Sequence, residues 1–206
     1  MPEIGGVIFS SIFLDKTSPD DPRIDEMAQW GKKIRESGAV HGVEGNLSFR
    51  TKLGFIINGT GMVLDNINKD TVVEVRGVVF GLNRPSVYVK GVVVPSMETL
   101  LHSGIYEALP EVNAIFHTHD NAVLKVTDKL GIPSTGTEQP AGSIELVQEA
   151  VNLIKLNDSV RYFVLKNHGI IALGATMAEA GALLEKMQDK ADISGLNKGS
   201  RKKKKE

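Results

Sequence analysis

The residues with the clearest chemical potential are two histidines, His117 and His119, which follow the apolar run 112–116. The β-branched and aromatic side chains of this run predict a buried strand. Because alternate strand side chains point to the same face, both imidazoles are expected to converge on one point. A third histidine, His168, follows the apolar run 162–165. Three imidazoles and an open fourth position are typical of catalytic zinc, so the sequence predicts a Zn²⁺ or other divalent metal site at these residues.

Glu98 is the candidate acid or base. It lies in the first turn of the helix predicted after Pro95-Ser96, where the helix dipole favours its charged form. An acidic residue placed only for helix stability is the alternative interpretation. His102 lies four residues further on the same helix face and could support the site from behind, although a core or partly exposed role is expected for it and for His41.

Small residues recur at three predicted turns: 45–48 (Gly-Asn-Leu-Ser), 59–61 (Gly-Thr-Gly) and Ser96 before the helix. Backbone amides in such turns, together with Asn, Ser and Thr side chains, can hold a phosphate without fixed positive charge. Each turn is common on its own. Combined with a metal site, they point to an anionic substrate.

The composition limits the classes of function. The 206 residues, 41% of them hydrophobic, can bury one full core, which we place at residues 1–195, with a basic and disordered tail at 196–206. The 24 basic and 25 acidic residues give no overall field for nucleic acid or membrane. There is no cysteine, so any metal must bind through nitrogen and oxygen. The apolar segment 4–14 is too short to span a bilayer, and a soluble, cytoplasmic protein is expected.

The periodicity predicts a mixed or antiparallel sheet covered by helices. Helices are expected at 22–38 (ending at Gly38), 96–109 (with Ser96 as N-cap), 121–130, 143–156 and 176–191, the last opened by a Thr176 to Glu179 capping box. Strands are expected at 4–14, 45–49, 54–58, 72–80, 87–94, 112–116, 161–166 and 169–173, and the segment 131–142 as a loop.

With these residues in view, the chain resembles the class II aldolase/adducin-head family. The resemblance rests on segments that occur in family order between residues 24 and 191: 45–48, 59–61, 95–99, 101–102, 105–106, 110–119 and 167–169. It implies an α/β fold, a three-layer α/β/α sandwich around a largely antiparallel central sheet. It also implies a homotetramer with active sites between subunits and a small-molecule sugar-phosphate substrate.

The resemblance also implies roles for individual residues. By position, His117, His119 and His168 match zinc ligands, and Glu98 matches an acid/base that can also bind the metal. The phosphate-binding positions match Asn46, Thr60, Gly61 and Ser96. The expected function is a zinc-dependent aldolase, a lyase that cleaves a ketose phosphate reversibly through a stabilised enediolate.

Two departures from the family leave alternatives open. The aldolases and the epimerase of the family typically use a tyrosine from a neighbouring subunit, whereas the three tyrosines here, Tyr88, Tyr106 and Tyr162, fall in predicted sheet or helix. The loop 131–142 offers Thr135, Thr137 and Glu138 instead; Glu138 is the candidate substitute, and a solvated loop residue is the alternative interpretation. Met97 stands where a second phosphate-binding serine is common. An epimerase or a dehydratase on the same site, and a non-catalytic adducin-like interaction module, are the alternatives. A cupin-type oxygenase is excluded, because no glutamate follows the His-x-His pair closely and helices are expected at Ser96 and Thr176.

Overall fold

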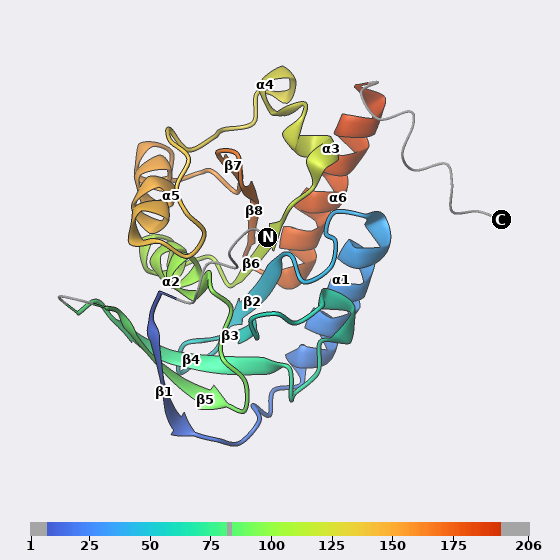
Figure 1. Ribbon diagram of the computed structural model, residues 1–206. Helices are drawn as coiled ribbons and strands as arrows, with labels where there is room; N and C mark the ends of the chain where they lie inside the picture. Colours follow the sequence, from blue (N-terminus) through green and yellow to red (C-terminus); the bar gives the residue numbers. More distant parts are fainter. Residues whose placement is uncertain (1–7, 82–83, 195–206) are drawn as a thin grey trace, which may run out of the picture.

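The structure, a computed structural model, describes residues 8–81 and 84–194. Its described part is built on one eight-stranded sheet with the strand order β1-β5-β4-β3-β2-β6-β8-β7 (Figure 1). The strands are β1 (Ser10–Asp15), β2 (Asn46–Arg50), β3 (Phe55–Asn58), β4 (Val72–Val79), β5 (Ser86–Gly91), β6 (Ala114–Thr118), β7 (Tyr162–Leu165) and β8 (Gly169–Gly174).

Neighbouring strands in this sheet are antiparallel, except that β1 runs parallel to β5. The predicted largely antiparallel sheet is therefore confirmed. Strand β2 lies beside β6 at the centre, and their register places Asn46 opposite His117. That pairing brings the predicted Gly-Asn-Leu-Ser turn next to the first of the candidate metal ligands.

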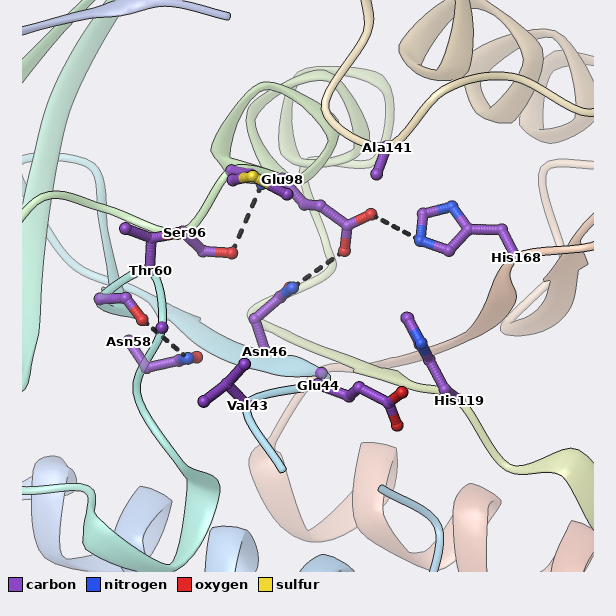
Figure 2. Close-up of a pocket in the computed structure, with 14 residues that line it drawn as sticks. Val43, Glu44, Asn46, Asn58, Thr60, Ser96, Glu98, His119, Ala141 and His168 are labelled. Atoms are coloured by element: carbon purple, nitrogen blue, oxygen red, sulfur yellow. Dashed lines mark hydrogen bonds and ion pairs between the residues drawn. The ribbon is translucent and has the colours of Figure 1, made fainter. Parts of the chain in front are cut away.

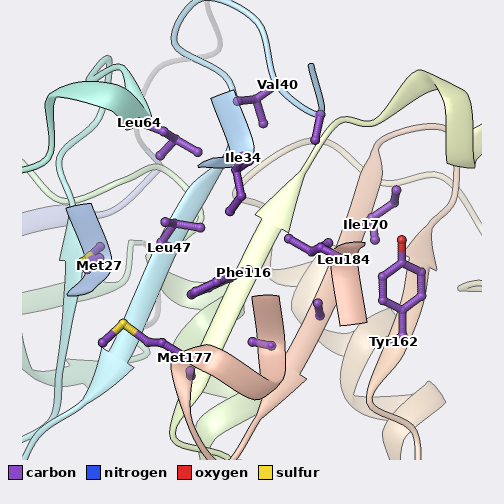
Figure 3. Close-up of a cluster of buried hydrophobic side chains, with 14 of the residues drawn as sticks. Met27, Ile34, Val40, Leu47, Leu64, Phe116, Tyr162, Ile170, Met177 and Leu184 are labelled. Atoms are coloured by element: carbon purple, nitrogen blue, oxygen red, sulfur yellow. The ribbon is translucent and has the colours of Figure 1, made fainter. Parts of the chain in front are cut away.

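Helices cover both faces of the sheet, giving the three layers that the resemblance implied (Figure 1). One buried cluster lies between the sheet and helices α1 and α6; it includes Met27, Leu47, Phe116 and Leu184 (Figure 3). The second lies on the opposite face against α2 and α5 and includes Leu101, Ile105, Ile115 and Ala150. The helices are α1 (Arg23–Ser37), η1 (Leu64–Asn66, a 3-10 turn), α2 (Thr99–Ala108), α3 (Asn121–Leu124), α4 (Thr127–Leu130), α5 (Ile144–Leu156) and α6 (Met177–Ile193).

The helix ends follow the signals in the sequence. Gly38 closes α1 in the left-handed region at φ 78° and donates its N–H to the Arg35 carbonyl oxygen. The Thr176 hydroxyl accepts the Glu179 amide at the start of α6, and Ser143 accepts the Leu146 amide at the start of α5.

Three expectations on element boundaries need correction. The helix predicted at 121–130 is two short helices, because Val126 leaves helical geometry (φ −118°, ψ 8°) and the Thr127 hydroxyl binds the Leu124 carbonyl oxygen. Ser96 is not the N-cap of α2, which begins at Thr99 after a turn in which the Thr99 amide donates to the Ser96 carbonyl oxygen. The first strand begins at Ser10.

The remaining expectations about the chain ends fall outside what is described. The predicted strand residues 4–7 and the predicted tail 196–206 lie outside the described residues. Within the described ranges, no helix combines the length and apolar character needed to cross a bilayer.

Candidate active site

Three histidines meet at one end of the central strands. His117 lies in β6, His119 follows the end of that strand, and His168 lies in the turn between β7 and β8. One ligand nitrogen from each of these residues lies within 4.8 Å of the others. The imidazole rings stand nearly perpendicular to one another, with centroid separations of 4.8, 5.0 and 5.1 Å. The structure thus brings together the three residues that the sequence pattern singled out.

A strained turn presents His168 to this cluster. Asn167 has a φ of 54°, the left-handed region that asparagine tolerates better than most non-glycine residues. The His168 amide donates to the Leu165 carbonyl oxygen at 3.0 Å and closes the turn. The Asn167 side-chain amide also donates to the Glu138 carboxylate at 2.8 Å, which fastens the turn to the 131–142 loop.

Glu98 lies immediately before α2, and its carboxylate faces the histidines (Figure 2). Its Oε2 atom lies 2.9 Å from His117 Nε2, and its Oε1 atom lies 3.0 Å from His168 Nε2. The Asn46 side-chain amide donates to Oε2 at 2.9 Å. Glu98 is only 4% exposed, so its carboxylate is oriented by these partners with little access to bulk water.

The donor set fits a divalent cation. The Nδ1 atom of His117 lies 3.0 Å from the Ile170 carbonyl oxygen, which only accepts, so Nδ1 carries the hydrogen. Nε2 is then the ring atom left to bind a cation, and it lies 2.9 Å from Glu98 Oε2 and 2.9 Å from His119 Nε2. Lone pairs that converge on one point repel unless a proton or cation lies between them, and nitrogen and oxygen ligands suit zinc. The bond to Ile170 also orients the His117 ring, as outer partners of metal-binding histidines do.

Burial and neighbouring charges set the protonation states. Burial, with help from the neighbouring His117 and His168, lowers the pKa of His119 to about 3, so its imidazole is neutral at pH 7. Burial alone would raise the pKa of Glu98, but the facing histidines outweigh it and hold this pKa well below its usual value. Burial opposes the charged form of His168, yet its hydrogen bond to Glu98 raises the pKa of the imidazole. The site therefore contains an ionised carboxylate beside a neutral His119 imidazole, and the contact with Glu98 favours the charged form of His168.

Gly169 makes this close approach of the rings feasible. A Cβ atom at this position would lie 2.5 Å from His117 Cε1, 2.7 Å from the Thr118 carbonyl oxygen and 2.9 Å from His119 Cδ2. We therefore expect Gly169→Ala to displace two ligand rings and to weaken Zn²⁺ affinity by about 10- to 100-fold, as the loss of orienting contacts typically does. Isothermal titration of the metal-free protein measures this change.

Gly77→Ala serves as the matched control, because a Cβ atom there meets nothing within 4 Å. It should leave the Zn²⁺ affinity unchanged. An alanine at position 169 that binds zinc as tightly as the wild type would show that the rings do not need this space.

A cavity of about 200 Å³ opens in front of Glu98, His119 and His168. The four residues predicted to bind phosphate all line it, and they come from three separate segments: Asn46, Thr60, Gly61 and Ser96. The turns of Thr60 and Ser96 are joined, because the Thr60 amide donates to the Val94 carbonyl oxygen and the Ser96 amide to that of Asn58. Gly59 and Met97, which the sequence placed beside the expected phosphate-binding residues, also line the cavity. Four further lining residues were not expected from the sequence: Val43, Glu44, Asn58 and Ala141.

Other candidates lie away from the cavity. Tyr88, Tyr106 and Tyr162 lie in β5, α2 and β7, as expected, and none of them lines the cavity. Glu138 is exposed in the loop and contacts Asn167. His41 is exposed outside the cavity, whereas His102 is fully buried behind Glu98.

Comparison with known proteins agrees with this architecture. An L-fuculose phosphate aldolase from Methanocaldococcus jannaschii is 26% identical over 180 residues, which cover 81% of this chain and 92% of the relative. A 5-methylthioribulose-1-phosphate/5-deoxyribulose-1-phosphate aldolase from Escherichia coli is 26% identical over 177 residues, covering 79% and 78% of the two chains. The solved structure of an L-fuculose 1-phosphate aldolase superposes with a TM-score of 0.70 at 23% identity, covering 87% of each chain, and so shares the fold.

A family model extends over almost the whole described chain. The model of the Class II Aldolase and Adducin N-terminal domain matches residues 25–194, the segment that contains β2 to β8, all of the candidate metal ligands and Glu98. The chain belongs to the class II aldolase and adducin N-terminal domain family.

Proposed function

We propose that this protein is a zinc-dependent aldehyde-lyase that cleaves a ketose phosphate by a reversible retro-aldol reaction. The observation that carries this proposal is the meeting of three imidazoles and one ionised, buried carboxylate, of which Glu98, His119 and His168 line a single cavity. The aldolase names of the relatives that cover most of this chain support the same class of reaction. An interaction module without catalysis would gain nothing from a buried carboxylate facing three histidines, because such a cluster is costly to desolvate.

A divalent cation held by His117, His119 and His168 would supply Lewis-acid stabilisation of the negative charge that develops on the substrate oxygens. Glu98 supplies the proton transfer. In the condensation direction the ionised Glu98 takes a proton from the substrate carbon that becomes the nucleophile. In the cleavage direction the protonated Glu98 returns that proton to the same carbon after the C–C bond breaks, while the hydroxyl that becomes the aldehyde carbonyl releases its proton to water in the cavity. The Asn46 side-chain amide donates to Oε2 of this carboxylate at 2.9 Å and so fixes the orientation of the carboxylate toward the substrate carbon.

Neutral donors would hold the phosphate end of the substrate. Thr60, Ser96 and Asn46 contribute side-chain donors to the cavity wall, and Gly61 turns the backbone there at φ 70°. Among the described residues, the cavity wall contains no lysine or arginine. Recognition of an anion would therefore depend on oriented dipoles, as it does in glycine-rich phosphate loops.

Metal removal tests the proposal. We expect purified protein to contain zinc and to cleave a ketose 1-phosphate such as L-fuculose 1-phosphate to dihydroxyacetone phosphate and an aldehyde, measured by a coupled reduction. Dialysis against a chelator should abolish turnover without loss of the circular dichroism spectrum, and added Zn²⁺ should restore it. Turnover that persists after chelation, or a chain that binds no divalent metal, would refute a metal-dependent lyase. The homotetramer implied by the family resemblance stays a prediction.

A further inference from the structure

A row of polar side chains, here called the polar seam, connects the central strand β2 to helix α2; it consists of Asn46, Ser48, Arg50, Glu98, His102 and Tyr106. Side chains alternate along β2, so Leu47 and Phe49 enter the cluster beneath α1 and α6, while Asn46, Ser48 and Arg50 face the other way. On that second face they meet polar residues of α2 and its start. The sheet face is otherwise apolar here, with Ile57 of β3 and Ile115 of β6 opposite Ser48 in register.

Three pairs of residues, here called rungs, connect β2 to α2 and its start. In the first, Asn46 Nδ2 lies 2.9 Å from Glu98 Oε2. In the second, Ser48 Oγ lies 2.7 Å from His102 Nδ1. In the third, the Arg50 guanidinium lies 4.6 Å from the centre of the Tyr106 ring.

The middle and last rungs are linked, because Ser48 Oγ also lies 2.8 Å from Tyr106 Oη. The Arg50 guanidinium further donates to the Tyr106 carbonyl oxygen at 2.8 Å. The strand residues are spaced by two and the helix residues by four. Two strand residues advance about 6.8 Å and four helix residues about 6.0 Å, so successive residues of the seam on β2 and on α2 remain opposite each other.

Stability alone does not account for this seam. Ser48 and His102 are both 0% exposed, and His102 Nε2 has no hydrogen-bond partner among the described residues. Burial lowers the pKa of His102 to about 3, so the ring is neutral and forms no ion pair. A leucine of similar size would fill the same space without a buried polar atom, which usually stabilises a core at least as well.

Hydrogen bonds, unlike apolar contacts, fix how one element is aligned along another. A slide of α2 by one residue would shift its side chains by about 1.5 Å and break each rung. Glu98 stands at the start of this helix, and its two oxygens each lie about 3 Å from a histidine. We propose that His102, held by Ser48, is a positioning residue that fixes the register of α2 and thereby the place of the Glu98 carboxylate in the active site.

The inference rests on the proposed lyase function, and three variants test it. His102→Leu removes the middle rung but leaves Ser48 bonded to Tyr106. His102→Asn retains a polar atom near the place of Nδ1. Ile105→Met, at a fully buried apolar position of the same helix, controls for general repacking.

For His102→Leu we expect kcat to fall about 10- to 100-fold, the loss that misplacement by about an ångström can cause, with KM within about twofold of the wild type. Its zinc content should be unchanged and its thermal midpoint equal or higher. Hydrogen exchange of amides 98–102 should accelerate. His102→Asn should keep kcat within about threefold, and Ile105→Met should match the wild type.

A wild-type kcat in His102→Leu, or a rise of KM in parallel with the loss of kcat, would overturn the positioning role, as would Asn and Leu variants that are equally impaired. If the Leu variant does not fold, Ser48→Ala breaks the same rung from the strand and is judged by the same measurements. If the wild type cleaves no ketose phosphate, the proposed function fails. In that case unchanged exchange of amides 98–102 in His102→Leu would still refute the positioning role, and faster exchange would support it.

Discussion

Glu98→Gln is expected to lower kcat for ketose phosphate cleavage by about 10²- to 10⁴-fold, the range that general acid–base catalysis by one side chain supplies. Glutamine keeps the shape of the side chain and can still contact Asn46 and one histidine. It cannot accept a proton, however, and it cannot carry the charge that the facing histidines stabilise. Steady-state kinetics, with zinc content determined by mass spectrometry, separates the loss of the base from the loss of the metal.

Glu145→Gln is the control for this experiment. Glu145 lies in the first turn of α5, as Glu98 lies at the start of α2, but Glu145 is exposed and lies away from the cavity. If Glu98 served only the helix dipole, the two variants would behave alike, each with a modest change in stability and normal turnover. A Glu98→Gln enzyme that retains wild-type kcat would remove this residue from the chemistry.

The sequence predicted those parts of the fold that depend on local patterns. The β-branched run before His117 forms most of strand β6, and the cap signals at Gly38 and Thr176 mark helix ends. The convergence of the three histidines could also be predicted, because each follows an apolar run and the ends of neighbouring strands lie at one edge of a sheet. The family resemblance added the three-layer architecture around a largely antiparallel sheet and a role for Glu98.

The sequence pattern did not predict how the two faces of β2 are used. Alternation of Asn46, Ser48 and Arg50 with two apolar residues is typical of a strand with one face in water. The structure instead buries this polar face, because α2 brings matching partners from about fifty residues away. Such long-range pairing leaves no local signal. For the same reason the sequence favoured a core or partly exposed role for His102. It also did not indicate that Glu44 lines the cavity.

His168→Ala is expected to abolish measurable turnover and to weaken Zn²⁺ binding by more than the 10- to 100-fold that loss of an outer partner typically causes, because a ligand itself is removed. His168 is the best of the three for this test. It lies in a turn and is partly exposed, whereas His117 is fully buried and its removal would leave the Ile170 carbonyl oxygen without its partner. Titration of metal-free protein with Zn²⁺ and the cleavage assay measure the two effects.

His41→Ala is the matched control, because His41 is exposed outside the cavity and its contact with Glu44 is made by the backbone amide, which alanine keeps. This variant should bind zinc and turn over substrate as the wild type does. The combined pattern separates the possible origins of activity. If His168→Ala loses zinc and turnover together while the fold persists, the metal and the carboxylate act as one site. If it loses zinc but still cleaves the ketose phosphate, Glu98 performs the reaction without the metal, and the cluster of histidines must then be assigned to folding or to another ligand.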